Sequence, residues 1–250
     1  MPIEFTEDYL LDKRVKIMQP TNGYRASSDA VLLSAMVDDV KANAKILDVG
    51  SGTGAVSLCL AQRLQKQQVQ IYGIDVQPEL VELADLSAAA NGFDFVRFLN
   101  TDIRQKPHNG ELAPCSFDVV ISNPPYSEHD MPSPNKSKAT AHNHHDFGLL
   151  QWLEFCLKMT KPFGRIYMVN RAEALPQICT ALQNKAGDLT VLPIYSKDGQ
   201  IAKRIIISAQ KDSKAPSKIL PPFVTHDESG KYTDKAEKIL RQGLTFKDIF

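Results

Sequence analysis

The residues with the clearest chemical potential are Asn123, Pro124 and Tyr126, in the run Ser-Asn-Pro-Pro-Tyr at 122–126. They follow an apolar run, 117–121, that favours a strand. Two consecutive prolines end a strand because proline lacks an N–H and fixes φ. The Asn123 side chain and the Pro124 carbonyl offer two acceptors, and Tyr126 offers a flat stacking face. Such a corner suits a planar NH2 group of adenine, cytosine or an amide, although a plain Pro-Pro turn remains an alternative.

A second feature is a glycine-rich turn between a predicted strand, 45–49, and a predicted helix, 55–64. Its chemistry-bearing residues are Asp48, Gly50, Gly52 and Gly54. Strand, glycine turn and helix are typical of nucleotide binding, because glycines let the backbone approach a ligand. The spacing G-x-G-x-G is neither the G-x-G-x-x-G of NAD enzymes nor a P-loop. A carboxylate at the strand end repels a pyrophosphate but binds an ammonium group, so the pattern favours S-adenosylmethionine. The alternative is a turn used for packing.

Two further acids end strand-like runs. Asp75 closes the run 69–75 and lies 21 residues after Gly54 (75 − 54), close to the spacing of a carboxylate that binds ribose hydroxyls. Asp102 and Ile103 follow the run 95–100, and an acid there can accept a hydrogen bond from an adenine amine. The alternative for Asp75 is a solvent-facing turn residue, and Asp102 gains weight from its place on the same sheet edge.

The order of these elements predicts an α/β protein. Strand and helix alternate from residue 45 onward, which implies a parallel sheet. Late strand-like runs at 189–195 and 204–208, joined by a short turn, predict an antiparallel hairpin at the sheet edge. We therefore expect a Rossmann-like, seven-stranded, mostly parallel sheet with an antiparallel last strand. Residues 1–44 are expected to form an N-terminal extension that packs on a catalytic domain of residues 45–250.

Residues 127–146 are polar and lack periodicity, which favours a loop beside the site. It contains Lys136 and Lys138, and Lys203 and Arg204 add positive charge further along. These four are candidate substrate contacts, with ordinary surface lysine as the alternative. The His-rich stretch 142–146 raises a metal hypothesis, but no second ligand cluster is evident and no metal is expected. Trp152, in a predicted helix at 149–159, is expected in the core.

Composition narrows the functional class. The formal net charge is zero, with 43% hydrophobic and 23% charged residues, which is ordinary for a globular protein. Any nucleic-acid partner must therefore meet a local basic face. The four cysteines form no C-x-x-C pair, so no disulfide framework is indicated. The N-terminus lacks signal-peptide features, and no apolar run is long enough to span a membrane. A cytoplasmic monomer is expected.

Taken together, these motifs carry a resemblance. The series from Asp48 to Gly54, with Asp75, Asp102 and 123–126, resembles class I S-adenosylmethionine-dependent methyltransferases that act on amino nitrogens. The flanking segments 19–33 and 221–233 are similar to those of the tRNA adenine-N6 methyltransferase family, whose members modify the adenine next to the anticodon of a valine tRNA. The resemblance covers nearly the whole chain. The loop after Tyr126 departs from it, with lysines and histidines in place of arginines.

The resemblance implies roles and a partner. Gly50, Gly52 and Asp75 would bind the methyl donor, and Asp102 would contact its adenine. Asn123 and Pro124 would orient the target nitrogen, Tyr126 would stack on the target base, and the partner would be tRNA. A protein glutamine N5-methyltransferase is the main alternative, although only 47 residues precede Asp48 and leave little room for the helical domain of that class. A non-catalytic S-adenosylmethionine- or RNA-binding module is the other.

Overall fold

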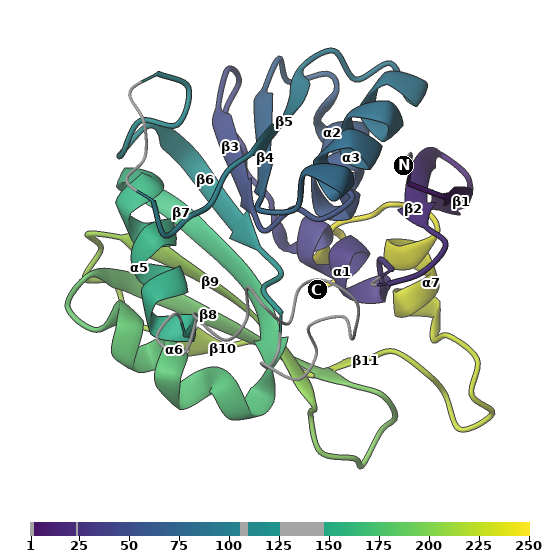
Figure 1. Ribbon diagram of the computed structural model, residues 1–250. Coiled ribbons are helices and arrows are strands. Elements are labelled where there is room, and N and C mark those ends of the chain that lie inside the picture. The colour runs from purple at the N-terminus through teal and green to yellow at the C-terminus, as the bar shows by residue number, and fades with distance from the viewer. Residues whose placement is uncertain (1–2, 24, 106–109, 126–147) are drawn as a thin grey trace.

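The computed structural model describes residues 3–23, 25–105, 110–125 and 148–250. Its centre is a nine-stranded sheet in the order β10-β8-β9-β7-β6-β3-β4-β5, with β11 also paired to β8 (Figure 1). The strands are β3 (Lys45–Val49), β4 (Gln70–Asp75), β5 (Val96–Asn100), β6 (Phe117–Ser122), β7 (Thr160–Arg171), β8 (Ala186–Tyr195), β9 (Arg204–Lys211), β10 (Lys218–Ile219) and β11 (Phe223–Val224).

Strand direction confirms the predicted sheet. Strands β5, β4, β3, β6 and β7 run parallel, and β9 runs antiparallel to both β7 and β8. The last long strand is therefore the antiparallel one. It is not at the edge, because β9 lies between β7 and β8 and its centre, Ile205–Ala209, is buried on both faces. The two-residue strands β10 and β11 extend the sheet beyond the seven expected.

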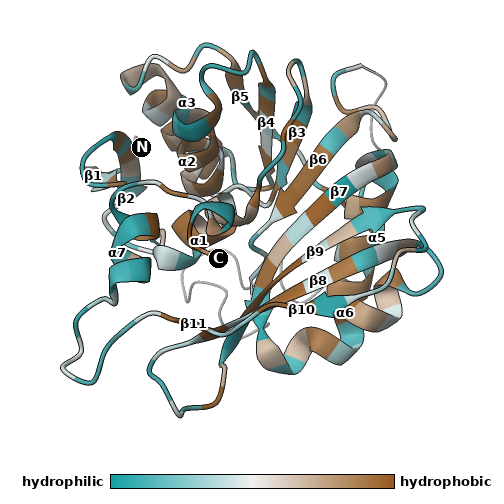
Figure 2. Cartoon of the chain, turned by 180° about the vertical axis from the view of Figure 1, so that it is seen from behind, coloured by the Kyte–Doolittle hydropathy of each residue, from teal (hydrophilic) through white to brown (hydrophobic). Residues whose placement is uncertain are grey.

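Helices cover both faces of the sheet (Figure 1). On one face, α1 (Ser28–Met36), α2 (Ala55–Leu64) and α3 (Pro78–Ala90) pack into the larger apolar cluster. On the other, α5 (Leu149–Met159) and α6 (Leu175–Leu182) pack into a second cluster with the opposite strand face. Figure 2 shows apolar residues concentrated along the central strands and in α2. The two apolar layers fix the sheet between them, and the parallel strands β5, β4, β3, β6 and β7 all end at the same edge.

The N-terminal segment attaches to the helical layer. It begins with an antiparallel hairpin of β1 (Phe5–Leu10) and β2 (Val15–Pro20). The Met18 N–H donates to Ser87 Oγ at 2.8 Å, and the Lys16 N–H donates to Asn91 Oδ1 at 2.9 Å, so β2 is bonded to α3. Helix α1, apolar on nearly every side, is buried between α2 and the sheet, which explains its lack of a polar face.

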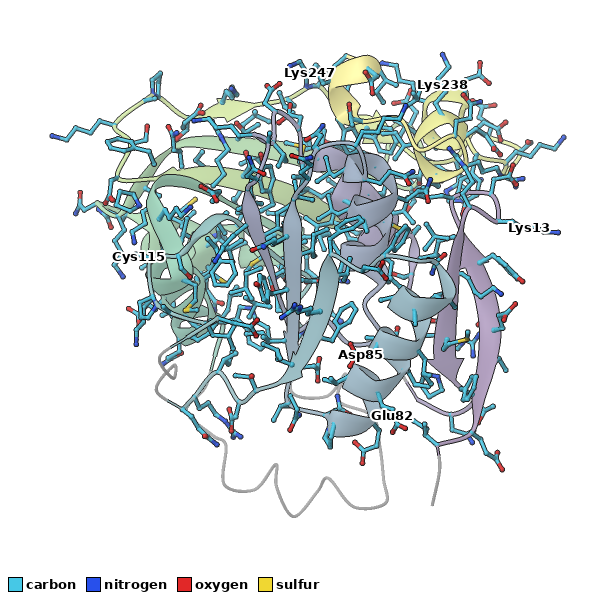
Figure 3. The ribbon with its side chains drawn as sticks, turned by 90° about the horizontal axis from the view of Figure 1, so that it is seen from above. Lys13, Glu82, Asp85, Cys115, Lys238 and Lys247 are labelled. Carbon is cyan, nitrogen blue, oxygen red and sulfur yellow. The ribbon has the colours of Figure 1, made fainter. Side chains whose placement is uncertain are left out.

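The C-terminal segment returns to the same side. It contains α7 (Asp234–Leu240) and the 3-10 turn η2 (Phe246–Asp248), and a further 3-10 turn, η1 (Ala172–Ala174), precedes α6. Helix α7 packs on α1, and Lys247 Nζ donates to Asp39 Oδ1 at 2.7 Å (Figure 3). The N-terminal hairpin, α1 and α7 therefore pack on the same side of the sheet.

Candidate active site

The glycine turn joins β3 to α2 at the carboxyl edge of the sheet. The Gly50 and Ser51 N–H groups both donate to the Ile74 carbonyl at 2.9 Å, which fixes the turn against the end of β4. Gly50, Gly52 and Gly54 have φ values of +72°, +54° and +83°, in the left-handed region that other residues seldom occupy. The turn therefore requires glycine for its backbone path alone.

Close packing also leaves no room for a side chain at Gly50 and Gly54, whereas a side chain at Gly52 would meet no neighbouring atom. A Cβ at Gly50 would lie 2.8 Å from Trp152 Cζ2, and one at Gly54 would lie 2.5 Å from Phe98 Cζ. A Cβ at Gly52 would have no atom within 4 Å. Packing therefore explains part of the requirement at Gly50 and Gly54, while Gly52 exposes its backbone where a ligand can approach.

Asp48 is a buried carboxylate with spare bonding capacity. It is 1% exposed, and its Oδ2 accepts from Ser57 Oγ at 2.8 Å. Its Oδ1 has no hydrogen-bond partner among the described residues, and neither does the buried Ser51 Oγ. Burial raises the pKa of Asp48 to about 7. Buried polar atoms without partners are costly, so the turn fits a polar ligand with a cationic group, as the ammonium of S-adenosylmethionine is.

Asp75, at the end of β4, lies next to the glycine turn and bonds to its backbone. Its Oδ2 accepts from the Gly52 N–H and its Oδ1 from the Gln77 N–H, both at 2.9 Å. Burial raises the pKa of Asp75, and these two backbone donors oppose that rise. Each oxygen keeps a lone pair for a hydroxyl donor. Val76 beside it is 55% exposed, an apolar face that sequence reasoning missed because nothing in the pattern separates it from a buried valine.

Asp102 and Ile103 follow β5, next to Asp75. The Thr101 N–H donates to the Asp75 carbonyl at 2.9 Å, which joins the ends of β5 and β4. Asp102 Oδ1 accepts from the Arg104 backbone N–H at 3.0 Å and from Nε at 2.7 Å, and the two side chains form an ion pair. Ile103 packs partly buried against the second apolar cluster. The contact with Arg104 was not foreseen from the sequence.

The Asn123 corner lies beside the glycine turn. Strand β6 pairs with β3, and Ser122 stands opposite Val49, so Asn123 and Gly50 follow paired residues. Asn123 is half-buried, Pro124 is buried and Pro125 is exposed. Ser122 Oγ donates to the Val49 carbonyl at 2.7 Å and accepts from Trp152 Nε1 at 2.9 Å. From the sequence, Trp152 is expected in the core and Ser122 has no assigned role. The short motif at 122–126 does not indicate that these two side chains meet.

Of the remaining predicted residues, the structure describes Lys203 and Arg204. Tyr126, Lys136 and Lys138 lie outside the described residues, as does the His-rich stretch 142–146. Lys203 is exposed, whereas the Arg204 guanidinium pairs with Asp29, a buried carboxylate at the start of α1. In the part of the chain that the structure describes, no three His, Cys, Asp or Glu side chains gather as metal ligands, and no helix is long and apolar enough to cross a membrane.

Comparisons with known proteins agree with this geometry. Residues 40–223 match the family described as methyltransferase domain. A protein of Tolumonas auensis named tRNA1(Val) (adenine(37)-N6)-methyltransferase is 30% identical over 175 residues, covering 68% of this chain and 70% of that protein. A protein of the same name from Actinobacillus succinogenes is 27% identical, covering 92% of this chain and 94% of that protein.

Solved structures share the fold. A predicted O-methyltransferase of Agrobacterium tumefaciens superimposes with a TM-score of 0.71 at 22% identity, covering 87% of this chain and 97% of that one. A putative class I S-adenosylmethionine-dependent methyltransferase of Listeria monocytogenes gives a TM-score of 0.55 at 20% identity, covering 78% and 62%. With the family match, the glycine turn and the strand order, these findings show that the chain is a class I S-adenosylmethionine-dependent methyltransferase, in the family that includes the proteins named tRNA1(Val) (adenine(37)-N6)-methyltransferase.

Proposed function

We propose that the enzyme transfers the methyl group of S-adenosylmethionine to N6 of an unpaired adenine in the anticodon loop of a tRNA. Relatives that carry this activity in their names, at 25–30% identity, support the substrate. The single structural observation behind the proposal is the pairing of Ser122 with Val49, because Asn123 and the glycine turn then start side by side. Donor and acceptor groups bound at these two positions would be neighbours.

The donor supplies an electrophilic methyl group, and the residues at the turn would hold and orient it. Asp48 Oδ1 would accept from the ammonium group, and the open side of Gly52 would admit the donor close to the backbone. The spare lone pairs of Asp75 would accept from the ribose hydroxyls. Asp102 would accept from the adenine amine, with Ile103 beside the ring. Gly50 and Gly54 would keep the turn in shape.

The corner would prepare the attacking nitrogen. The Asn123 side-chain oxygen and the Pro124 carbonyl would accept the two hydrogens of the adenine NH2 group. These bonds draw the nitrogen lone pair out of conjugation with the ring and make it a nucleophile. Tyr126 would stack on the base. A strong general base is unnecessary, since the amine becomes acidic once it is methylated.

Access decides which nucleic acid can serve. An adenine N6 in a duplex is paired and stacked, so the target base must be unpaired or flipped out. With a net charge of zero, tRNA affinity must come from few phosphate contacts and should be weak and salt-sensitive. Lys136, Lys138 and Lys203 are the candidates. Arg204 would contribute only from the side of its guanidinium that Asp29 leaves uncovered.

We also propose that residues 1–44 form an extension on a catalytic domain of residues 45–250. The bonds from β2 to α3 and the packing of α1 on α2 support that division. The extension would then be a fixed wall of the enzyme, because its hairpin is bonded to the helical layer.

The test is incubation with labelled S-adenosylmethionine and separate pools of tRNA, rRNA, DNA and release factors. Label should enter tRNA, and nuclease digestion should release N6-methyladenosine. A matched control is a valine tRNA transcript in which guanine replaces the adenine next to the anticodon, and it should take no label. The proposal would be overturned if label entered a protein glutamine and none entered the RNA.

A further inference from the structure

Trp152 joins the two halves of the active site. It lies in the first turn of α5, on the sheet face opposite α2, and is partly buried against the second apolar cluster. Its indole N–H donates to Ser122 Oγ at 2.9 Å, and the same oxygen donates to the Val49 carbonyl at 2.7 Å. Ser122 directly precedes Asn123, and Val49 directly precedes Gly50. One chain of hydrogen bonds, from Trp152 through Ser122 to Val49, therefore links the residues that precede Asn123 and Gly50.

The ring of Trp152 makes a second contact, with the glycine turn. A Cβ at Gly50 would lie 2.8 Å from Cζ2 and 2.9 Å from Cη2 of the indole, closer than real Cβ atoms come. The indole edge therefore lies directly against the Gly50 backbone. Trp152 therefore contacts the end of β6 through its N–H and the turn after β3 through its ring edge.

Ser122 makes the link specific. It is 0% exposed, and its hydroxyl uses its hydrogen for Val49 and a lone pair for Trp152. A buried hydroxyl of this kind is stabilised only while both partners stay in place. Displacing the indole would leave the Ser122 hydroxyl with the Val49 carbonyl as its one partner, so the ends of β3 and β6 would be held by backbone pairing and this weakened bond alone.

We propose that Trp152 is a positioning residue for methyl transfer, which sets the separation of the glycine turn and the Asn123 corner through Ser122 and Gly50. Transfer requires the nucleophile and the methyl group to meet in line at close range, and a misplacement of 1 Å can cost about 100-fold in rate. Trp152 acts through the two halves that hold the reactants. Its loss should therefore slow the transfer step more than it weakens donor binding.

The experiment uses three single variants of the full chain and the double variant that combines Trp152→Phe with Ser122→Ala. Trp152→Phe keeps an aromatic ring but removes the N–H, and Ser122→Ala removes the shared hydroxyl while keeping the indole. Phe155→Leu, on α5 in the same apolar cluster but outside the hydrogen-bond chain, is the packing control. Thermal unfolding identifies a variant that fails to fold. Donor affinity is measured by calorimetry with S-adenosylhomocysteine.

Kinetics on tRNA form the first arm, which rests on the proposed function. Trp152→Phe and Ser122→Ala should each lower kcat about 10- to 100-fold. KM for the donor should change little, and the double variant should be no slower than the worse single one. Phe155→Leu should lower Tm without this fall in kcat. Equal kcat in all variants, or effects of the two substitutions that multiply, would overturn the proposal.

Amide hydrogen exchange forms the second arm, which needs no acceptor. Ser122→Ala and Trp152→Phe should both speed amide exchange in residues 49–54 and in 118–123. Phe155→Leu should leave exchange in these two segments close to the wild-type rate. Unchanged exchange at both segments would overturn the role of Trp152, whatever the acceptor is. If wild-type enzyme does not methylate tRNA while exchange behaves as expected, the proposed substrate fails and the positioning role stands.

Discussion

The proposed donor side and the proposed acceptor side of the active site share one sheet edge but are assembled differently. The glycine turn of the donor side is specified within residues 48–77, where bonds from Gly50, Ser51 and Gly52 to the end of β4 fix it. The acceptor side depends on partners far along the chain: Ser122 bonds to Val49, 73 positions away, and to Trp152, 30 positions away. Donor-side changes should therefore alter binding first, and acceptor-side changes should alter rate.

The largest expected effect tests this separation directly. Asn123→Ala removes one of the two acceptors for the target amine, so single-turnover transfer of labelled methyl should fall at least about 100-fold, as it does when a preorganised polar group is removed from an enzyme site. Affinity for S-adenosylhomocysteine, measured by calorimetry, should stay near normal. Near-normal transfer would exclude Asn123 from the chemistry, and a parallel loss of donor affinity would show that the two sides are not separable.

Next in size is Asp75→Ala on the donor side. The change removes a carboxylate that holds the Gly52 N–H and, as proposed, the ribose hydroxyls. Charged hydrogen bonds are worth about 1.5–3 kcal/mol, so the Kd for the donor should rise about 10- to 100-fold. Transfer at saturating donor should recover most of its rate. Asp94→Ala, an exposed acid on the same half, is the control and should change neither quantity.

A smaller effect distinguishes backbone strain from ligand space. Gly52 and Gly92 have φ values of +54° and +68°, and a Cβ at either would meet no atom within 4 Å. Gly52→Ala and Gly92→Ala should each lower the free energy of unfolding by about 1–2 kcal/mol, because both place a side chain in the left-handed region. Chemical denaturation measures this. Donor affinity should fall only in Gly52→Ala, and equal affinity in both variants would move the donor away from Gly52.

The smallest effect is a pH dependence at Asp48, whose pKa burial raises to about 7. Between pH 6 and pH 7 the ionised fraction rises from about one tenth to one half, so donor affinity should rise about fivefold if an ammonium pairs with the carboxylate. The raised pKa also means that the folded protein holds a proton which the unfolded chain has released. Without donor, the contribution of Asp48 to the free energy of unfolding should therefore fall as pH rises from about 4 through 7.

Asp48→Asn is the matched variant for this dependence. The amide carries no charge at any of these pH values, so the rise in donor affinity should disappear, and the free energy of unfolding should lose the part of its pH dependence that Asp48 contributes. Calorimetry in buffers of different ionisation enthalpy should show proton release on donor binding in the wild type near pH 6.5 and none in the variant. A flat profile in the wild type would remove Asp48 from the ammonium site.

Much of the backbone geometry on the proposed donor side could be predicted because it is local. Left-handed glycines after a buried strand, and an acid closing the next strand, follow from short-range rules of backbone conformation and strand order. Val76 was missed, since exposure of an apolar side chain is decided by the elements around it. On the acceptor side, the motif at 123–126 marked the corner, but the bond from Trp152 to Ser122 joins separate elements and left no trace in local pattern.

The sequence by itself determined the alternation of strand and helix, the mostly parallel sheet and the carboxyl edge where the chemistry-bearing residues gather, because these depend on periodicity, glycine and proline. Tertiary structure alone decided that β9 inserts between β7 and β8, that Arg204 pairs with Asp29 in place of facing solvent, and that Trp152 bridges the ends of β3 and β6. Each of these depends on which buried surfaces meet across the chain. Burial and desolvation act between segments that local sequence rules treat separately.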